Sequence, residues 1–200
     1  MGVGMNRKNA GHVSSWQDEL LKKWRSYTND KDNPDRQALA ELRRGLGKPP
    51  GSETMMYKHI LVTITPMRPN QEIAAFIVGS LYGLCWELQE AEDRLTFASS
   101  LRKTEKSQSF EKRFVNLYRS DIKQLPFQLA QSAKYIKSKR ASKGVIEIDW
   151  RGLIDDVANW DHPDRYVQRR WARDWWSFQQ DATDSQNLDS DQNEDSPASQ

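Results

Sequence analysis

Tryptophans at helical spacing near the end of the chain constrain its fold more than any other feature. Four of the eight tryptophans lie in the stretch Trp160–Trp176, WDHPDRYVQRRWARDWW. A helix turns by about 100° per residue, so one face, roughly 80° wide, collects Val167, Trp171, Trp175 and Phe178. Such an apolar stripe is typical of a helix that buries one side in a core. The stretch predicts a core helix begun by Pro163, with Trp171 and Trp175 in the core and not in ligand binding.

The opposite face of the same helix is basic, at Arg165, Arg169 and Arg173. Residues four apart in a helix rise by about 6 Å, which matches the spacing of successive phosphates along a nucleic-acid strand. A guanidinium group also offers a planar pair of donors to phosphate oxygens. Arg170 lies on a flank of this face. The other interpretation is a solvated helix back with Asp164 and Asp174 as ion-pair partners, and this helix alone leaves both open.

Helix-start signals recur along the rest of the chain. They are Ser15 with Asp18 as a capping box, Asn33 followed by Pro34, Asn70, Ser109, Asp121 and Asp149. Asn70 is predicted to start a helix from Gln71 to about Thr96, in which Gly79 and Gly83 form a face for close packing of another helix. The segment Thr54–Thr65 is ambiguous between strand and helix, and we assign it to helix.

These signals predict an all-α fold of about eight helices, because no convincing strand pair stands out. Leu101–Ser109 is polar and mixed, and we place a boundary between two small helical bundles there, residues 14–100 and residues 108–180. Residues 1–13 are rich in Gly and Asn, and residues 181–200 are polar and acidic. Both terminal segments are predicted to be disordered.

Cysteine usage and hydropathy indicate a protein of the cytoplasm. The single cysteine excludes a disulfide framework within the chain and fits a reducing compartment. The first 15 residues hold no apolar block of the kind that a signal peptide needs. The longest apolar run, Ile73–Leu88, is shorter than the roughly 20 residues of a membrane span. We expect a soluble, cytoplasmic protein.

The net charge of +2 conceals an uneven distribution. Residues 181–200 hold six of the 28 acidic side chains and no Lys or Arg. Residues 1–180 therefore carry 30 basic side chains against 22 acidic ones, a balance of +8. A basic body of this kind suggests an anionic partner such as nucleic acid.

Signals for catalysis are poor, and we expect no metal and no cofactor. The histidines are far apart in sequence, and no His or Cys pair has metal-ligand spacing. Cys85 lies in an apolar segment, where it is read as a small buried hydrophobe. Asp155 and Asp156 keep open a metal-dependent nuclease. A second alternative is a stand-alone helical DNA-binding regulator of the helix-turn-helix type, although Asp164 near the start of the last helix would repel phosphate.

Basic clusters on three other predicted helices favour nucleic-acid binding. They are Arg43 with Arg44, then Lys112 with Arg113 and Arg119, and finally Lys134, Lys137, Lys139, Arg140 and Lys143. Each cluster alone is compatible with a solvated helix end. Together they predict a basic surface along an elongated helical body, suited to contact with strand backbones, where charge is read and base sequence is not.

Several of these motifs together resemble the CasB family, the small subunit of the type I-E CRISPR surveillance complex Cascade. They are Leu42-Arg43-Arg44 after a proline-started helix, Ser109–Phe114 with Arg119, Ile148-Asp149-Trp150 with Leu153 and Asp156, and Trp160-Asp-His-Pro with Arg170–Asp174. The resemblance covers about residues 15–178 and is most specific in Trp160–Trp175. The first dozen residues, the acidic tail and Leu101–Ser107 depart from the family pattern.

The resemblance implies an all-α fold of two bundles and a subunit without catalytic activity. It implies two copies arranged head to tail in a complex with guide RNA, backbone subunits and a large subunit. Members stabilise the opened target DNA, the R-loop, through basic residues on strand backbones. Carried over by motif position, the residues expected to contact nucleic acid are first Arg44, Arg113, Arg119 and Arg165, and then Arg43, Lys112, Lys123, Arg169 and Arg170.

Overall fold

The computed structural model describes residues 15–61, 66–91, 95–105, 107–140, 142 and 145–177. The disorder predicted for residues 1–13 and 181–200 concerns residues outside these ranges, as does the place of Phe178 on the apolar stripe. Within the described ranges no helix is long and apolar enough to cross a membrane.

The described residues form an all-α fold, as predicted. The helices are α1 (Trp16–Ser26), α2 (Arg36–Arg43), a 3-10 turn η1 (Thr54–Met56), α3 (Tyr57–Ile60), α4 (Pro69–Cys85), α5 (Phe97–Thr104), α6 (Gln108–Arg119), α7 (Leu125–Lys139) and α8 (Trp150–Ala158). A further helix covers residues 166–177, and we call it the closing helix. Two short strands, β1 (Gln89–Glu90) and β2 (Glu147–Ile148), pair in parallel, with Gln89 opposite Glu147.

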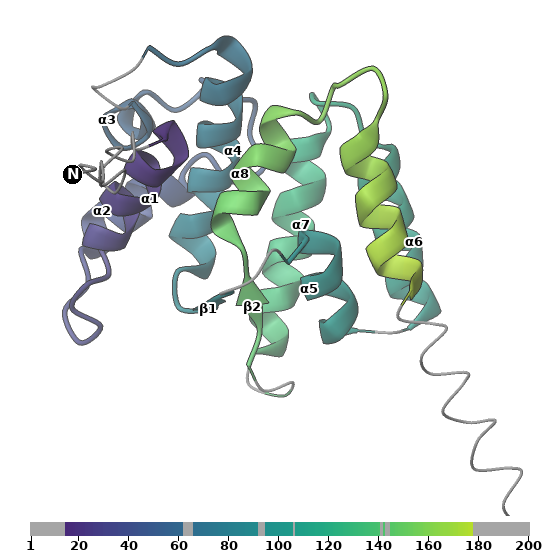
Figure 1. Ribbon diagram of the computed structural model, residues 1–200. Helices are drawn as coiled ribbons and strands as arrows, with labels where there is room; N and C mark the ends of the chain where they lie inside the picture. The colour runs from purple at the N-terminus through teal and green to yellow at the C-terminus, as the bar shows by residue number, and fades with distance from the viewer. Residues whose placement is uncertain are drawn as a thin grey trace, which may run out of the picture.

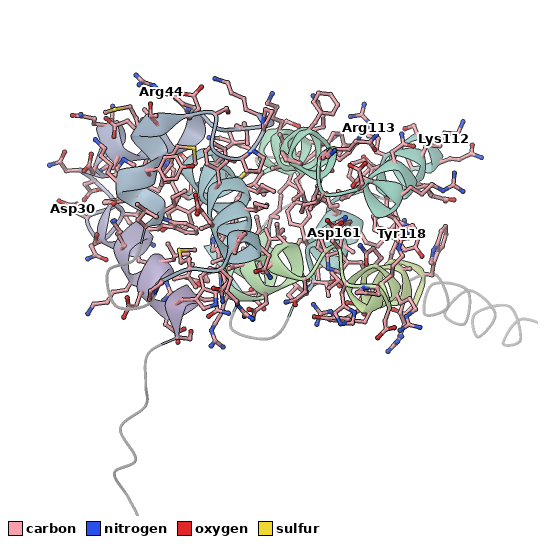
Figure 2. The ribbon with its side chains drawn as sticks, turned by 90° about the horizontal axis from the view of Figure 1, so that it is seen from above. Asp30, Arg44, Lys112, Arg113, Tyr118 and Asp161 are labelled. Carbon is pink, nitrogen blue, oxygen red and sulfur yellow. The ribbon has the colours of Figure 1, made fainter. Side chains whose placement is uncertain are left out.

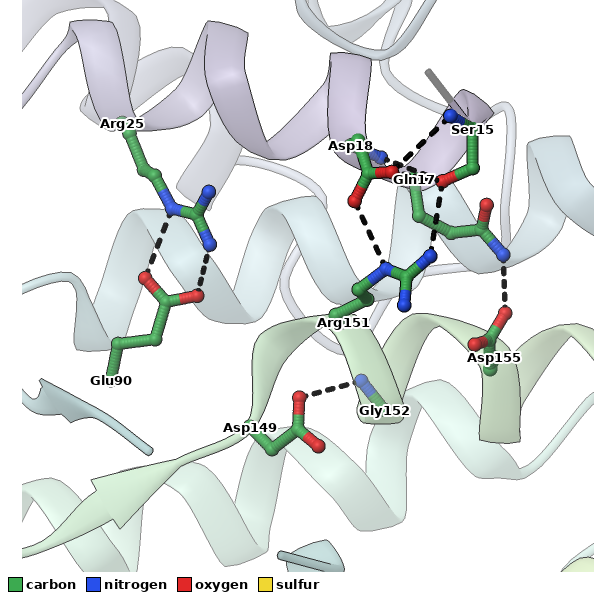
Figure 3. Close-up of polar contacts among 9 residues, drawn as sticks. All are labelled: Ser15, Gln17, Asp18, Arg25, Glu90, Asp149, Arg151, Gly152 and Asp155. Atoms are coloured by element: carbon green, nitrogen blue, oxygen red, sulfur yellow. Dashed lines mark hydrogen bonds and ion pairs between the residues drawn. The ribbon is translucent and has the colours of Figure 1, made fainter. Parts of the chain in front are cut away.

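Side-chain caps confirm two of the predicted helix starts. The Ser15 hydroxyl accepts a hydrogen bond from the Asp18 backbone N–H at 3.3 Å, and the Asp18 carboxylate accepts one from the Ser15 N–H at 3.2 Å, which completes the capping box of α1. The Asp149 carboxylate accepts from the Gly152 N–H at 2.7 Å and starts α8. Figure 3 shows both caps.

Other helices start a few residues from the predicted position. Asp35, and not Asn33, caps α2, through a 2.9 Å hydrogen bond from the Ala38 N–H. The helix assigned to Asn70 already begins at Pro69, and α6 follows Ser107 instead of Ser109. The Asp121 carboxylate closes a turn by accepting from the backbone N–H groups of Lys123 and Gln124, so α7 begins only at Leu125.

The helix predicted from Gln71 to Thr96 was wrong in length. The helix α4 ends at Cys85, and the chain then pairs β1 with β2, a pairing that the sequence did not indicate. Thr96 caps α5 by accepting from the Ser99 N–H at 3.2 Å. Every residue of α5 except Lys103 is buried, so α5 is part of the core although its sequence is largely polar.

One hydrophobic cluster joins the helices on either side of the predicted boundary. Figure 1 shows α4, α8 and α7 at the centre, with α1–α3 on one side and α6 and the closing helix on the other. A Cβ atom on Gly83 would lie 2.7 Å from the Leu39 carbonyl oxygen, so the predicted small-residue face of α4 is where α2 packs. The helix α8 packs against α1 and α4, whereas its sequence position lies in the predicted second bundle. The division at residues 100 and 108 stays a prediction.

The tryptophans of the closing helix are buried, as predicted. Val167, Trp171 and Trp175 are all 1 % exposed or less, whereas Arg169 and Arg173 on the other face are exposed. Trp175 stacks on Phe114 with ring centroids 4.1 Å apart. The helix begins at residue 166 instead of at Pro163, because residues 163 and 164 form a turn.

A buried carboxylate ties α2 to α3. Glu41 accepts hydrogen bonds from Lys58, from His59 Nε2 at 2.7 Å and from Gln37. The Nδ1 atom of His59 in turn lies 3.0 Å from the Tyr27 hydroxyl of α1. The contacts with Lys58, His59 and Gln37 lower the pKa of Glu41 from 4.5 to about 2.

The stability that Glu41 contributes should depend on pH. Because its folded-state pKa lies below the unfolded value near 4.5, the contribution is present in full above about pH 4.5 and is lost as the pH falls toward 2. We expect Glu41→Gln to be less stable than the parent at pH 7, with a difference that shrinks on acidification. Urea unfolding between pH 2.5 and 7 measures this, with Glu87→Gln, in an exposed pair with Arg140, as the control. A difference independent of pH would contradict the assignment.

Candidate nucleic-acid interface

All nine residues predicted to contact nucleic acid have exposed side chains, on four parts of the fold. They are Arg43 and Arg44 at the end of α2, Lys112, Arg113 and Arg119 on α6, Lys123 before α7, and Arg165, Arg169 and Arg170 at the closing helix. Within the described residues, no carboxylate forms an ion pair with any of them except Arg170. Exposed guanidinium and ammonium groups without a carboxylate partner are the groups that a phosphate backbone can engage.

Arg119 and Arg165 meet at one groove, of about 270 Å³, where α6 ends and the closing helix begins. The carboxylates of Asp121 and Asp161 also line it, so the groove is not uniformly basic. The Asp121 carboxylate, however, already accepts two backbone N–H groups in the turn before α7. We call this the Arg119–Arg165 groove.

Arg165 is held in place by its backbone and by α6. Its φ of +47° lies in the left-handed region, which costs a residue other than glycine on the order of 1 kcal/mol. Its Nη2 donates to the Tyr118 carbonyl oxygen at 3.0 Å, and its guanidinium carbon lies 5.5 Å from the centre of the Tyr118 ring. Its carbonyl oxygen accepts from the Arg169 N–H at 3.0 Å and so opens the closing helix. The side chain is therefore oriented before any ligand arrives.

Lys112 and Arg113 project from the middle of α6, whose apolar face packs on α7 and the closing helix. The guanidinium carbon of Arg113 lies 5.8 Å from the centre of the Tyr135 ring, which stacks on Phe110. In Figure 2, Arg113 and Arg44 point outward along the same edge of the molecule. The structure thus places the ends of the predicted set, from α2 and from α6, on one side.

Arg170 lines a different groove from Arg119 and Arg165. This groove, of about 700 Å³, lies beside α8 and is lined by four arginines: Arg25, Arg151, Arg170 and Arg173. Three of them are already paired, since Arg25 contacts Glu90, Arg151 contacts Asp18 and Arg170 contacts the buried Asp156. Figure 3 shows the first two of these pairs. We call this the α8 groove; the pattern of arginines in the sequence did not separate it from the rest.

Asp155 and Asp156, the two acidic residues behind the nuclease alternative, form hydrogen bonds or ion pairs with other residues of the fold. Asp156 is buried and accepts from Trp171 Nε1 at 2.6 Å as well as from Arg170. Burial raises the pKa of its carboxyl to about 6, against the lowering effect of these two donors. Asp155 accepts from the Gln17 side chain. In the described residues no three His, Cys, Asp or Glu side chains are grouped so that they could hold a metal ion.

Cys85 is buried, as expected. Its thiol lies 3.8 Å from the Ala133 carbonyl oxygen, and burial raises its pKa to about 12. The thiolate that a nucleophile requires is therefore strongly disfavoured near neutral pH.

Comparison with known proteins identifies the family. The family model described as CRISPR-associated protein Cse2 matches residues 38–176, which is more than half of the chain. The chain belongs to the Cse2 family. A CRISPR-associated protein Cse2 of Thermus thermophilus is 32 % identical over 144 residues, which cover 70 % of this chain and 78 % of the relative.

Solved structures of Cse2 relatives share the fold. CasB from Thermus thermophilus superposes with a TM-score of 0.65 at 28 % identity, covering 80 % of this chain and 97 % of the relative. A chain of a CRISPR RNA-guided surveillance complex superposes with a TM-score of 0.66 at 24 % identity, covering 87 % and 99 %. The resemblance to the CasB family is confirmed. All nine predicted contact residues fall inside the matched range 38–176, whereas the acidic segment 181–200 lies outside it.

Proposed function

We propose that this Cse2 family member is a non-catalytic subunit of the type I-E CRISPR complex Cascade, where it stabilises the R-loop during antiviral defence in the cytoplasm. Family membership supports a place in a CRISPR system. Solved structures that share its fold include chains of CRISPR RNA-guided surveillance complexes. Its partners are then the backbone and large subunits, guide RNA, target DNA and a second copy of the same chain.

One observation carries the proposed role in nucleic-acid binding: exposed basic side chains without carboxylate partners gather at the Arg119–Arg165 groove and along the edge that bears Arg44 and Arg113. By contrast, Arg25, Arg140 and Arg151 pair with carboxylates. Lys22, Arg36 and Arg68 are also exposed and make no ion pair with a described carboxylate, but they do not line the Arg119–Arg165 groove. A phosphate that binds at the first set displaces no internal ion pair. Contacts of this kind depend on backbone charge and are indifferent to base sequence.

Modest contacts suffice for this role. An R-loop exchanges a DNA duplex for an RNA–DNA duplex of similar stability, so the exchange is nearly balanced. A subunit that adds a few phosphate contacts only to the opened state shifts the balance toward it. No catalytic group is required, and the partners of Asp155 and Asp156 described above agree with a structural role for both.

The proposal is tested by omission and add-back. Cascade assembled without this chain should lose its R-loop faster than the complete complex, and the added chain should restore the lifetime. The variant Arg119→Ala/Arg165→Ala should restore it only in part, with a shortfall on the order of tenfold for two lost phosphate contacts. The control, Arg25→Ala/Arg140→Ala, removes two paired arginines and should restore it fully.

Two outcomes would favour another function. If the chain fails to co-purify with guide RNA and the other subunits, and the isolated protein binds one DNA sequence selectively, the stand-alone regulator is correct. If the complete complex and the complex that lacks the chain hold the R-loop equally long, the stabilising role is wrong even though the chain is a Cse2 family member.

A further inference from the structure

Phe127 on α7 is exposed, unlike the other described phenylalanines. Phe76, Phe97, Phe110 and Phe114 are 3 % exposed or less, whereas Phe127 is 53 % exposed. No described aromatic ring stacks on Phe127. The other four phenylalanines, on α4, α5 and α6, all lie in the core cluster. A large apolar ring held in water on a rigid helix is available to a ligand with a flat, apolar face.

The side chains in line with Phe127 are polar or basic. Gln131 and Lys134 follow it by four and seven residues on the exposed face of α7, and the exposed Lys123 lies in the turn before this helix. Neither lysine forms an ion pair with a described carboxylate. The ring therefore lies on a basic strip and not at the centre of an apolar patch.

The turn after α2 brings further positive charge to this strip. Gly47 has a φ of +75°, and a Cβ atom built on it would lie 3.3 Å from Ala130 Cβ and 3.9 Å from Phe127 Cα. Only a residue without a side chain fits this backbone conformation and this close approach easily. Because Arg44 lies three residues before Gly47, the end of α2 with its two exposed arginines adjoins the start of α7. In Figure 2, Arg44 lies on the same edge as Arg113.

We propose that Phe127 is a stacking platform for a base of single-stranded nucleic acid, whose phosphates contact Arg44, Lys123 and Lys134. Aromatic rings interleaved with basic side chains are how proteins grip single strands without reading their sequence. Paired bases are covered by their neighbours in the duplex, so the ring selects an unpaired strand. A protein partner would also bury the ring, but the surrounding charges without described carboxylate partners favour a polyanion. The inference rests on the proposed nucleic-acid-binding function and refines it.

The test compares Phe127 variants of the full chain on a single strand and on a duplex. The probes are a 20-nucleotide oligothymidine with a 2-aminopurine reporter and the same strand in duplex form. Phe127→Ala and Phe127→Leu should each weaken binding of the single strand roughly tenfold, while Phe127→Trp should retain it and show quenched Trp and 2-aminopurine fluorescence. Binding of the duplex should not change. Because no charge is lost, the slope of log affinity against log salt should stay that of the parent.

Folding and alternative roles are separable in the same experiment. Phe127→Leu keeps an apolar side chain at an exposed position, so its thermal unfolding should match that of the parent and any loss is a loss of the ring. Equal single-strand affinity of the parent and both ring-less variants would overturn the stacking inference and leave the proposed function intact. Retained single-strand binding with loss of the variants from assembled Cascade would overturn it too, in favour of a protein contact. A parent chain that assembles but contacts no nucleic acid would overturn both proposals.

Discussion

Replacing Trp171 by alanine is expected to lower the free energy of unfolding by about 5 kcal/mol. The side chain is fully buried, with ring centroids 5.1 Å from Trp160 and 5.9 Å from Phe97. Truncating a buried tryptophan costs about 3–5 kcal/mol through lost transfer energy and the cavity left behind. Its Nε1 also donates to the buried Asp156 at 2.6 Å, and removing that donor costs about another 1–3 kcal/mol. Such a loss is a large part of the stability of an ordinary domain.

Trp176 supplies the matched control for this result. It lies on the same helix but is 39 % exposed, so Trp176→Ala should change the free energy of unfolding by no more than about 0.5–1 kcal/mol. Urea unfolding followed by far-UV circular dichroism measures both variants, and the melting temperature of Trp171→Ala should fall by about 10 °C or more. Similar losses for the two variants would show that the apolar stripe of the closing helix is not what holds it to the core.

The closing helix also shows why one part of the fold could be predicted from sequence. Its apolar residues repeat at helical spacing, and that period alone fixes which side is buried and which carries Arg169 and Arg173. Helix ends carry a weaker signal. Asn33 and Asp35 are both good capping residues, and the choice of Asp35 goes with the packing of Leu39 and Leu42 against α4, a segment distant in sequence.

The segment after α4 was mispredicted for a related reason. Leu101–Ser109 is polar and mixed and so indicated a candidate boundary, and α5, which overlaps it, buries polar side chains beside Phe97, Ala98 and Leu101 and so shows no clear apolar period. The pairing of β1 with β2 could not be predicted from the sequence either, since it joins two-residue strands that lie far apart in the chain. Non-local contacts decide both elements, and propensity is a weak guide where they do.

For the candidate site too, local sequence patterns predicted some properties, and contacts between distant segments decided the others. Exposure of the arginines followed from helical periodicity, but their pairing did not. Arg170 contacts Asp156 from a neighbouring helix, and Arg25 contacts Glu90 across two elements, so only the folded chain separates paired from unpaired cations. The left-handed backbone of Arg165 also had no sequence signal. For Phe127 a signal existed, because it lies about 200° around α7 from Leu125 and Leu129, on the face away from the core.

The second large effect that we expect is a loss of DNA affinity when arginines without an ion-pair partner are replaced. Replacing Arg44, Arg113 and Arg119 together by alanine is expected to weaken target-DNA binding by assembled Cascade on the order of 100-fold near physiological salt, because each lost phosphate contact costs about 1 kcal/mol. The slope of log affinity against log salt should fall by about 2–3, since fewer counterions are released. All three side chains are exposed and make no ion pair with a described carboxylate, so the fold should survive.

A second triple variant removes the same formal charge without removing a free cation. Arg25, Arg140 and Arg151 pair with Glu90, Glu87 and Asp18, so their replacement by alanine exposes three carboxylates and leaves the proposed contact surface intact. We expect less than about a threefold change in DNA affinity, because exposed pairs of this kind contribute little and lie away from the Arg119–Arg165 groove. Filter binding across a salt series measures both variants. Equal losses would mean that net charge alone governs binding, and an unchanged affinity for the Arg44, Arg113 and Arg119 variant would show that the contact surface lies elsewhere on the molecule.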